Sequence, residues 1–305
     1  MVESLAPPPP VDAFLLLIAV VGVSFSGPLM AATAAPALAI AFWRNALGGG
    51  FAVTLAALRR TPELRRLQRP TLVSAGLAGV ALAVHFGTWV PSLTMTSVAS
   101  ATALVCSQTI FTALIARLRG RHLPSAAWFG ILAATVGAVL ITGADVGVST
   151  RALAGDLLAL AGAVAAAVYV TIGAAARRQM STASYTAICY VTCATLLLAV
   201  CLLVGIRLAG YPVNAWVKLI LVTACAQLLG HSLINVVLRS TSATVVSLAI
   251  LLEVPGAALI AYVWLHQHPP ALALPGVGLL LVGLLLVARI GARVEEKQAH
   301  ADLEL

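Results

Sequence analysis

The stretch that decides the fold runs from Ser240 to His268 and reads STSATVVSLAILLEVPGAALIAYVWLHQH. It is long enough to cross a bilayer, because about 20 apolar residues span the hydrocarbon core. One carboxylate, Glu253, lies near its middle, and Pro255 follows two residues later. A charged side chain inside a membrane is costly, so Glu253 is expected to have a partner, a cavity or a functional role.

The same pattern occurs earlier in the chain. Thr96-Ser97 precede the tetrapeptide ALIA at 113–116, and Thr241-Ser242 precede ALIA at 258–261, so both pairs are 145 residues apart. At the same offset, Gln108 takes the place of Glu253. The chain therefore reads as two related halves, an organisation found in many secondary transporters.

The composition places the whole chain in a membrane. Of its 305 residues, 61% are hydrophobic and only 9% are charged, and the mean hydropathy is +1.04. A soluble domain carries about 25% charged residues. The pattern predicts an all-α integral membrane protein with ten transmembrane helices, which are expected at 12–31, 36–58, 71–91, 94–117, 124–143, 153–176, 182–206, 213–236, 240–265 and 270–291.

The basic residues predict the orientation of these helices. Fourteen of the 18 lysines and arginines fall in the connections of one side or after the last helix, three fall on the other side, and Arg44 lies inside the second helix. This asymmetry predicts a multi-pass protein of the cell membrane with both termini in the cytoplasm. The net charge of +8 is therefore interpreted as a topology signal, and no nucleic-acid partner is expected.

Five helices in each half force the second half to enter the membrane upside down. The expected organisation is a cytoplasmic leader at 1–11, a first five-helix repeat at 12–143, a second, inverted repeat at 153–291, and a cytoplasmic tail at 292–305. Two Gly/Pro pairs, Gly27-Pro28 and Pro255-Gly256, are expected to break helices one and nine and to free backbone groups for a cavity.

Several segments share the pattern of a known transporter family. They are Phe42 to Asn45, the repeated segments 96–116 and 241–261, Gly155 to Leu160, and the glycine-rich segments 130–143 and 276–283. In these segments the chain resembles the EamA-like branch of the drug/metabolite transporter superfamily. The resemblance implies ten helices in two five-helix repeats and a transport function. Characterised relatives export amino acids, other metabolites or drugs, and others exchange sugar phosphates.

Two charged residues inside the membrane are candidates for function. Burial disfavours a charged carboxyl group, so Glu253 is a candidate for proton coupling, with a fixed structural carboxylate as the alternative. Arg44 could bind an anionic group of a substrate or act as a structural partner of Glu253.

Several polar and aromatic side chains are expected to line a substrate cavity. His85 and His231 occupy near-equivalent positions in the two halves, and Trp89 and Asn235 follow them by four residues, which places each pair on one helix face. The predicted cavity is surrounded by helices one, three, four, six, eight and nine, a set that the family resemblance suggests. The predicted substrate-binding residues are His85, Trp89, Gln108, Tyr169, His231 and Asn235.

The sequence carries no HExxH, GxSxG or GxxxxGK[ST] motif, and its connections are too short to hold a catalytic domain. No metal site, no cofactor and no enzymatic activity are expected.

The prediction is a secondary transporter, expected to export small metabolites or drugs by alternating access, with proton coupling left open. The alternatives are an integral-membrane enzyme that uses the buried His and Glu residues, and a facilitative channel. The expected partners are a small-molecule substrate and the lipid bilayer, and the protein is expected to be a monomer or a homodimer.

Overall fold

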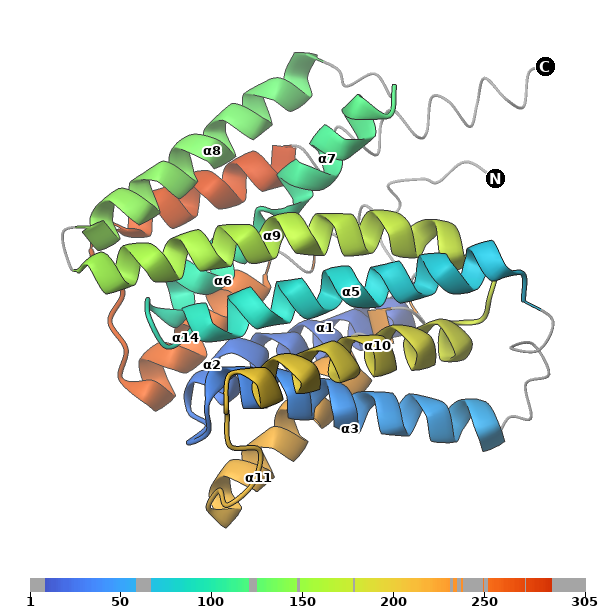
Figure 1. Ribbon diagram of the computed structural model, residues 1–305. Coiled ribbons are helices and arrows are strands. Elements are labelled where there is room, and N and C mark those ends of the chain that lie inside the picture. Colours follow the sequence, from blue (N-terminus) through green and yellow to red (C-terminus); the bar gives the residue numbers. More distant parts are fainter. Residues whose placement is uncertain are drawn as a thin grey trace, which may run out of the picture.

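Helices are the only regular secondary structure in the described part of the chain (Figure 1). The computed structural model describes residues 9–58, 67–120, 125–146, 149–177, 179–230, 233–234, 237, 249, 252–271 and 273–286. The named helices are α1 (Pro10–Ser24), α2 (Ser26–Ala31), α3 (Ala37–Leu58), α5 (Arg69–Ser92), α6 (Val98–Cys106), α7 (Gln108–Leu118), α8 (Ser125–Val146), α9 (Thr150–Arg177), α10 (Thr182–Leu203), α11 (Val213–Val222), the π-helix η1 (Thr223–Gly230) and α14 (Glu253–Leu265). A further apolar helix covers Ala273–Leu286.

Six segments within the described residues are long and apolar enough to cross a membrane: Pro10–Ala31, Ala37–Leu58, Arg69–Ser92, Thr150–Gly173, Thr182–Leu203 and Val213–Gly230. Four shorter apolar helices, at Val98–Thr112, Trp128–Ile141, Glu253–Leu265 and Ala273–Leu286, lie within the predicted fourth, fifth, ninth and tenth spans. The all-helical membrane fold is thus confirmed, while the count of ten spans stays a prediction.

Helices of the two halves alternate in the core, where α3, α5, α9 and α10 lie side by side (Figure 1). Small residues allow this close packing. A Cβ added at Gly79 of α5 would lie 2.7 Å from the carbonyl oxygen of Cys189 in α10, and one at Gly162 of α9 would lie 3.2 Å from Cβ of Trp89 in α5. The backbone of α5 therefore packs directly against both second-half helices.

The breaks in helices one and nine do not fall at their prolines. The first helix ends at Ser24 and restarts at Ser26, so Phe25 is the break, and Pro28 lies within the short helix that follows. In the ninth, α14 runs continuously through Pro255-Gly256, so the predicted interruption there is wrong. Proline fits the first turn of a helix because the amide hydrogen that it lacks has no intrahelical partner there.

The predicted span at 94–117 consists of two helices, α6 and α7. Helix α6 begins at Val98, where the hydroxyl of Ser97 accepts a hydrogen bond from the Ser100 amide at 3.0 Å. A turn at Ser107 then separates α6 from α7. This part of the chain thus has an additional helix start inside the predicted membrane span.

The glycine-rich ends of the two halves pack against each other. A Cβ at Gly137 of α8 would lie 2.6 Å from the carbonyl oxygen of Gly276, and one at Gly276 would lie 2.8 Å from the carbonyl oxygen of Gly137. Only glycine allows two helix backbones to approach this closely. The last helices of the two predicted repeats therefore form one tightly packed pair.

Candidate functional site

Arg44 is the centre of the polar contacts in the core. Its side chain is only 2% exposed, although α3 is one of the apolar candidate spans. Its Nη1 donates a hydrogen bond to Oγ of Ser26 at 2.9 Å, and its Nε donates one to Oε1 of Gln227 at 3.2 Å. The sulfur of Met30 lies 3.7 Å from the same Nη1. Neutral groups from α2 and η1 therefore hold the guanidinium group.

The aromatic face of Phe86 covers the Arg44 guanidinium on another side. The Cζ atom of Arg44 lies 4.5 Å from the ring centroid, a geometry typical of a cation–π interaction. The rings of Phe86 and His85 are 4.7 Å apart, and the rings of His85 and Trp89 stack at 5.5 Å. The structure thus brings Arg44, His85 and Trp89, three of the predicted residues, into one continuous set of contacts.

Gln227 reaches Arg44 from a helix with an unusual hydrogen-bonding pattern. It lies in η1, an eight-residue π-helix, and π-helical turns occur often at functional sites. Gly48 of α3 makes room for it, because a Cβ at position 48 would lie 2.5 Å from Nε2 of Gln227. The wide turn on η1 and the missing side chain on α3 together allow the amide to approach Arg44.

His85 is fixed between α5 and α9. Its Nδ1 lies 2.9 Å from the carbonyl oxygen of Gly162. Because a carbonyl oxygen only accepts, Nδ1 carries the proton, and Nε2 is left as an acceptor in the neutral ring. His85 can therefore accept a hydrogen bond from a bound molecule through Nε2.

Two further buried polar atoms lack a hydrogen-bond partner within the described residues. They are Nε1 of Trp89, which is 4% exposed, and Oγ1 of Thr102, which is 1% exposed. Thr102 lies beside Gly27, next to Ser26, since a Cβ at Gly27 would approach its Oγ1 to 3.2 Å. Buried polar groups are nearly always paired, so these two are available for a ligand that enters the core.

Gln108 and Glu253, the twin positions of the sequence repeat, occupy the same local structure. Each is the first residue of a helix, α7 or α14. The preceding residues have nearly equal backbone angles, with φ −63° and ψ −5° at Ser107 and φ −68° and ψ −11° at Leu252. Each of these preceding residues also donates a backbone hydrogen bond to the residue three positions before it, at 3.1 Å and 3.0 Å. The sequence repeat is therefore also a repeat of backbone geometry.

Glu253 lies within electrostatic range of Arg44 without forming an ion pair with it in the described structure. The thiol of Cys106, at the end of α6, is a further neighbour of this carboxylate. The start of a helix carries a partial positive charge, which favours a carboxylate at the first position of α14. Glu253 and Arg44 are thus a separated pair of opposite charges inside the membrane protein.

Tyr169 is connected to the Arg44 site through Tyr190, which interacts with both Gln227 and Arg44. Tyr169 also interacts with the hydroxyl of Tyr185 at the interface of α9 and α10, where Gly173 makes room for that hydroxyl. The described contacts do not join Gln108 to Arg44. His231 and Asn235 lie outside the described residues, so their predicted role stays a prediction.

Four residues of the Arg44 site had no part in the predicted site: Ser26, Met30, Phe86 and Gln227. Phe86 follows His85 directly, but nothing in an apolar sequence distinguishes one phenylalanine as the partner of an arginine. Gln227 carried a usable signal, because an amide inside a predicted span is a polar residue at membrane depth. Ser26 was noticeable only as a neighbour of the Gly27-Pro28 pair.

Comparison with known proteins identifies the family. The family model described as "EamA-like transporter family" matches residues 12–143 and 153–289. A solved structure, described only as "Crystal structure of protein", is similar in fold, with a TM-score of 0.64 at 18% sequence identity, over 93% of this chain and 99% of that chain. No curated protein matches the chain. The two matches of the family model cover most of the chain, which therefore belongs to the EamA-like transporter family of the drug/metabolite transporter superfamily.

Proposed function

We propose that this membrane transporter is a secondary carrier that exports small metabolites, such as amino acids, or drugs by alternating access. The observation that carries the proposal is the pair of matched helix starts at Gln108 and Glu253. Two copies of one structural element, one in each half, can exchange roles when a carrier changes its open side.

The helices that follow the two matched starts, α7 after Gln108 and α14 after Glu253, run in opposite directions through the molecule. The side-chain Oε1 of Gln267, just after α14, accepts a hydrogen bond at 3.2 Å from the Val98 amide, which begins α6. The Gln267–Val98 contact therefore marks one end of the molecule, at which α14 finishes and α6 begins. The chain leads away from this end through α6 and α7, and it leads toward this end through α14. These directions support two inverted five-helix repeats, in which the shorter apolar helices complete ten membrane spans.

The halves are tied together at that same end, toward the left of Figure 1. Nζ of Lys218 donates to the carbonyl oxygen of Ala32 at 2.7 Å, and Nε1 of Trp43 donates to that of Leu208 at 2.8 Å. Nη2 of Arg151 donates to the carbonyl oxygen of Thr94 at 3.0 Å. These bonds and the Gln267 contact are called here the cross-half bonds. They support a conformation that is closed at this end and that opens when they break.

The substrate is proposed to bind around Arg44, His85 and Trp89, with Gln108, Tyr169, His231 and Asn235 as further contributors. Arg44 would face an anionic group of the substrate, and Nε2 of His85 and Nε1 of Trp89 offer one acceptor and one donor. Glu253 would couple transport to protons. In the cell, the protein is proposed to lie in the cell membrane as a monomer or homodimer.

The orientation can be tested by labelling. The end with the cross-half bonds is proposed to face outward and both termini to face the cytoplasm. A cysteine placed at Pro212 should then react with an impermeant thiol reagent in intact cells, while one placed at Gln179 should be protected. The reverse labelling pattern would show that the end with the cross-half bonds faces the cytoplasm.

Counterflow in proteoliposomes tests the function. Vesicles loaded with unlabelled amino acids, nucleosides or cationic drugs are placed in the corresponding labelled compound. A carrier accumulates label only in vesicles that contain the same compound, and this is the expected result. Label entry that does not depend on internal compound indicates a channel, and a chemically altered compound indicates an enzyme; either result would reject the carrier.

A further inference from the structure

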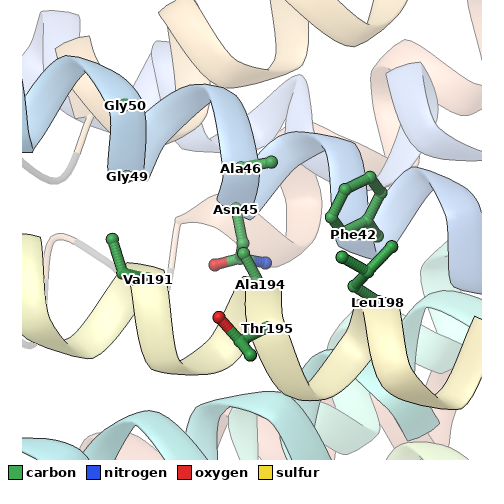
Figure 2. A pocket seen from close by; sticks show the side chains of 9 residues that line it. All are labelled: Phe42, Asn45, Ala46, Gly49, Gly50, Val191, Ala194, Thr195 and Leu198. Carbon is green, nitrogen blue, oxygen red and sulfur yellow. The ribbon is translucent and has the colours of Figure 1, made fainter.

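A concave site that neither Arg44 nor its partners line lies on the helix bundle. It is a groove of about 290 Å³ between α3 and α10. Its lining residues are Phe42, Asn45, Ala46, Gly49, Gly50, Val191, Ala194, Thr195 and Leu198 (Figure 2). We call this feature the lateral groove. Asn45 follows Arg44 in sequence, but the two side chains face different neighbours, because Arg44 points to η1 and α2.

The lateral groove opens toward the membrane interior. Both of its walls belong to candidate membrane spans, and Val191 at its rim is 44% exposed. Asn45 lies about 12 Å along α3 from Ala37 at a rise of about 1.5 Å per residue. The groove is thus at a depth where lipid, rather than water, surrounds the protein.

Asn45 presents an unused hydrogen-bond acceptor at the base of the groove. The residue is 0% exposed, and Nδ2 donates to the carbonyl oxygen of Ala41 at 2.9 Å. Its Oδ1 has no partner among the described residues. The bond to Ala41 fixes the orientation of the amide, because the reverse orientation would place two oxygens against each other. The free atom is therefore an acceptor, and it needs a donor.

Thr195 provides a second unused polar group. Many threonines in the described helices donate their hydroxyl to the carbonyl four residues earlier, as Thr54 and Thr171 do at 2.8 Å and 2.7 Å. Among the described contacts, Thr195 has no such bond. Figure 2 shows Asn45 extending from α3 toward Ala194 and Thr195 of α10. An acceptor and a hydroxyl group thus line the same groove between two apolar spans, where an unpaired polar group is costly.

We propose that the lateral groove binds a membrane-dissolved amphipathic molecule that carries a hydroxyl group on a narrow apolar body. The ligand hydroxyl donates to Oδ1 of Asn45 and accepts from the hydroxyl of Thr195, after a small side-chain movement that uncovers Oδ1. The apolar body lies along Ala46, Gly49 and Gly50. A volume of about 290 Å³ is at the small end of the range of ligand pockets, about 300–1,000 Å³, so the groove suits a small molecule rather than a partner helix.

The test uses the full-length protein in lipid nanodiscs and a photoreactive twelve-carbon alcohol that carries a diazirine group. The matched probe is its methyl ether, which has the same apolar body but no donor. After irradiation, mass spectrometry maps the labelled residues. The alcohol should label segments 42–50 and 191–198 about fivefold more than the ether does, which is the effect of one net hydrogen bond.

Two glycines supply a matched pair of variants. A Cβ at Gly50 or at Gly76 would meet no heavy atom within 4 Å, so both positions accept a larger side chain. Gly50→Leu fills the lateral groove and should reduce its labelling to that of other lipid-facing helices. Gly76→Leu makes the same change on α5, outside the groove, and should leave the labelling intact.

Asn45→Leu combined with Thr195→Val should remove the difference between alcohol and ether. The Gly50→Leu result stands on its own if that double variant does not fold. Three results would each overturn the proposal: equal labelling by both probes, labelling spread evenly over the lipid-facing helices, or labelling that persists in Gly50→Leu. Equal labelling by both probes would indicate that a trapped water or ordinary lipid contact occupies the groove.

Discussion

At the scale of single residues, the unusual feature is a buried arginine held by neutral groups. Ser26 and Gln227 bind Arg44, while Glu253 is close enough to interact but is not paired with it. In a medium of low dielectric constant, two separated opposite charges attract strongly. A pair that can close and reopen is suited to a carrier, because a substrate or a proton can take the place of one partner.

Glu253→Gln tests the proton side of this pair. The amide has the size of the acid but cannot ionise, and the twin position Gln108 already carries an amide at an equivalent helix start. We expect the variant to fold and to perform substrate exchange, but to lose stimulation by a proton gradient, as measured in proteoliposomes. Wild-type transport that never responds to pH would refute the coupling. A Glu253→Gln protein that fails to fold would indicate a structural carboxylate.

Gln227→Glu tests the arginine side. The new carboxylate would place an oxygen about where Oε1 now lies, 3.2 Å from Nε of Arg44. The present bond already has one charged partner, the guanidinium, and a carboxylate adds a second charge of opposite sign. If this adds about 1.4 kcal/mol of attraction, Arg44 should be held more firmly. We expect unchanged or higher thermal stability and counterflow reduced about tenfold.

The comparison variant is Gln227→Leu. It leaves Nε of the buried Arg44 without this partner, which costs about 1–3 kcal/mol of stability. Counterflow at the wild-type rate in Gln227→Glu would mean that Arg44 does not need to move during transport.

At the scale of elements, glycine contacts decide how closely helices approach. A Cβ at Gly276 would lie 2.8 Å from the carbonyl oxygen of Gly137 and 2.9 Å from the amide nitrogen of Ile141, both backbone atoms of α8. Gly278, two residues later on the same helix, meets nothing within 4 Å. The two positions therefore allow one substitution to be compared in two environments.

Gly276→Ala should lower the stability of the protein by about 1–3 kcal/mol, because overpacking forces the two helices apart. Gly278→Ala should not lower it, since alanine is the better helix former by about 1 kcal/mol. Thermal unfolding in detergent measures both variants. Equal midpoints would show that α8 and the helix Ala273–Leu286 do not pack as described.

The sequence predicted the elements better than their breaks. The repeat at an offset of 145 residues identified Gln108 and Glu253 as equivalent, and the structure gives both the same turn geometry. The positions of the breaks could not be read from the prolines, because Pro28 and Pro255 fit the first turn of the helix that follows. The π-helix at η1 had no signal in the hydrophobic pattern, so the approach of Gln227 to Arg44 could not be predicted.

At the scale of the whole molecule, alternating access requires the tied end to open. The cross-half bonds join connections of one half to the other half, as Lys218 does with Ala32. Single hydrogen bonds contribute about 1 kcal/mol each, so a set of them can hold one state without preventing its conversion. Breaking them should therefore be part of each transport cycle.

A reversible crosslink tests this requirement. Cysteines at Ala32 and Lys218, in a protein whose five native cysteines are replaced, are joined by a short bis-thiol reagent with a cleavable disulfide. We expect counterflow to stop in the crosslinked protein and to return after reduction, because the crosslink keeps this end closed. Cysteines at Arg207 and Tyr211, which contact each other within one connection, provide the control, and their crosslink should leave counterflow unchanged. Transport that continues while Ala32 and Lys218 are joined would mean that this end does not open during the cycle.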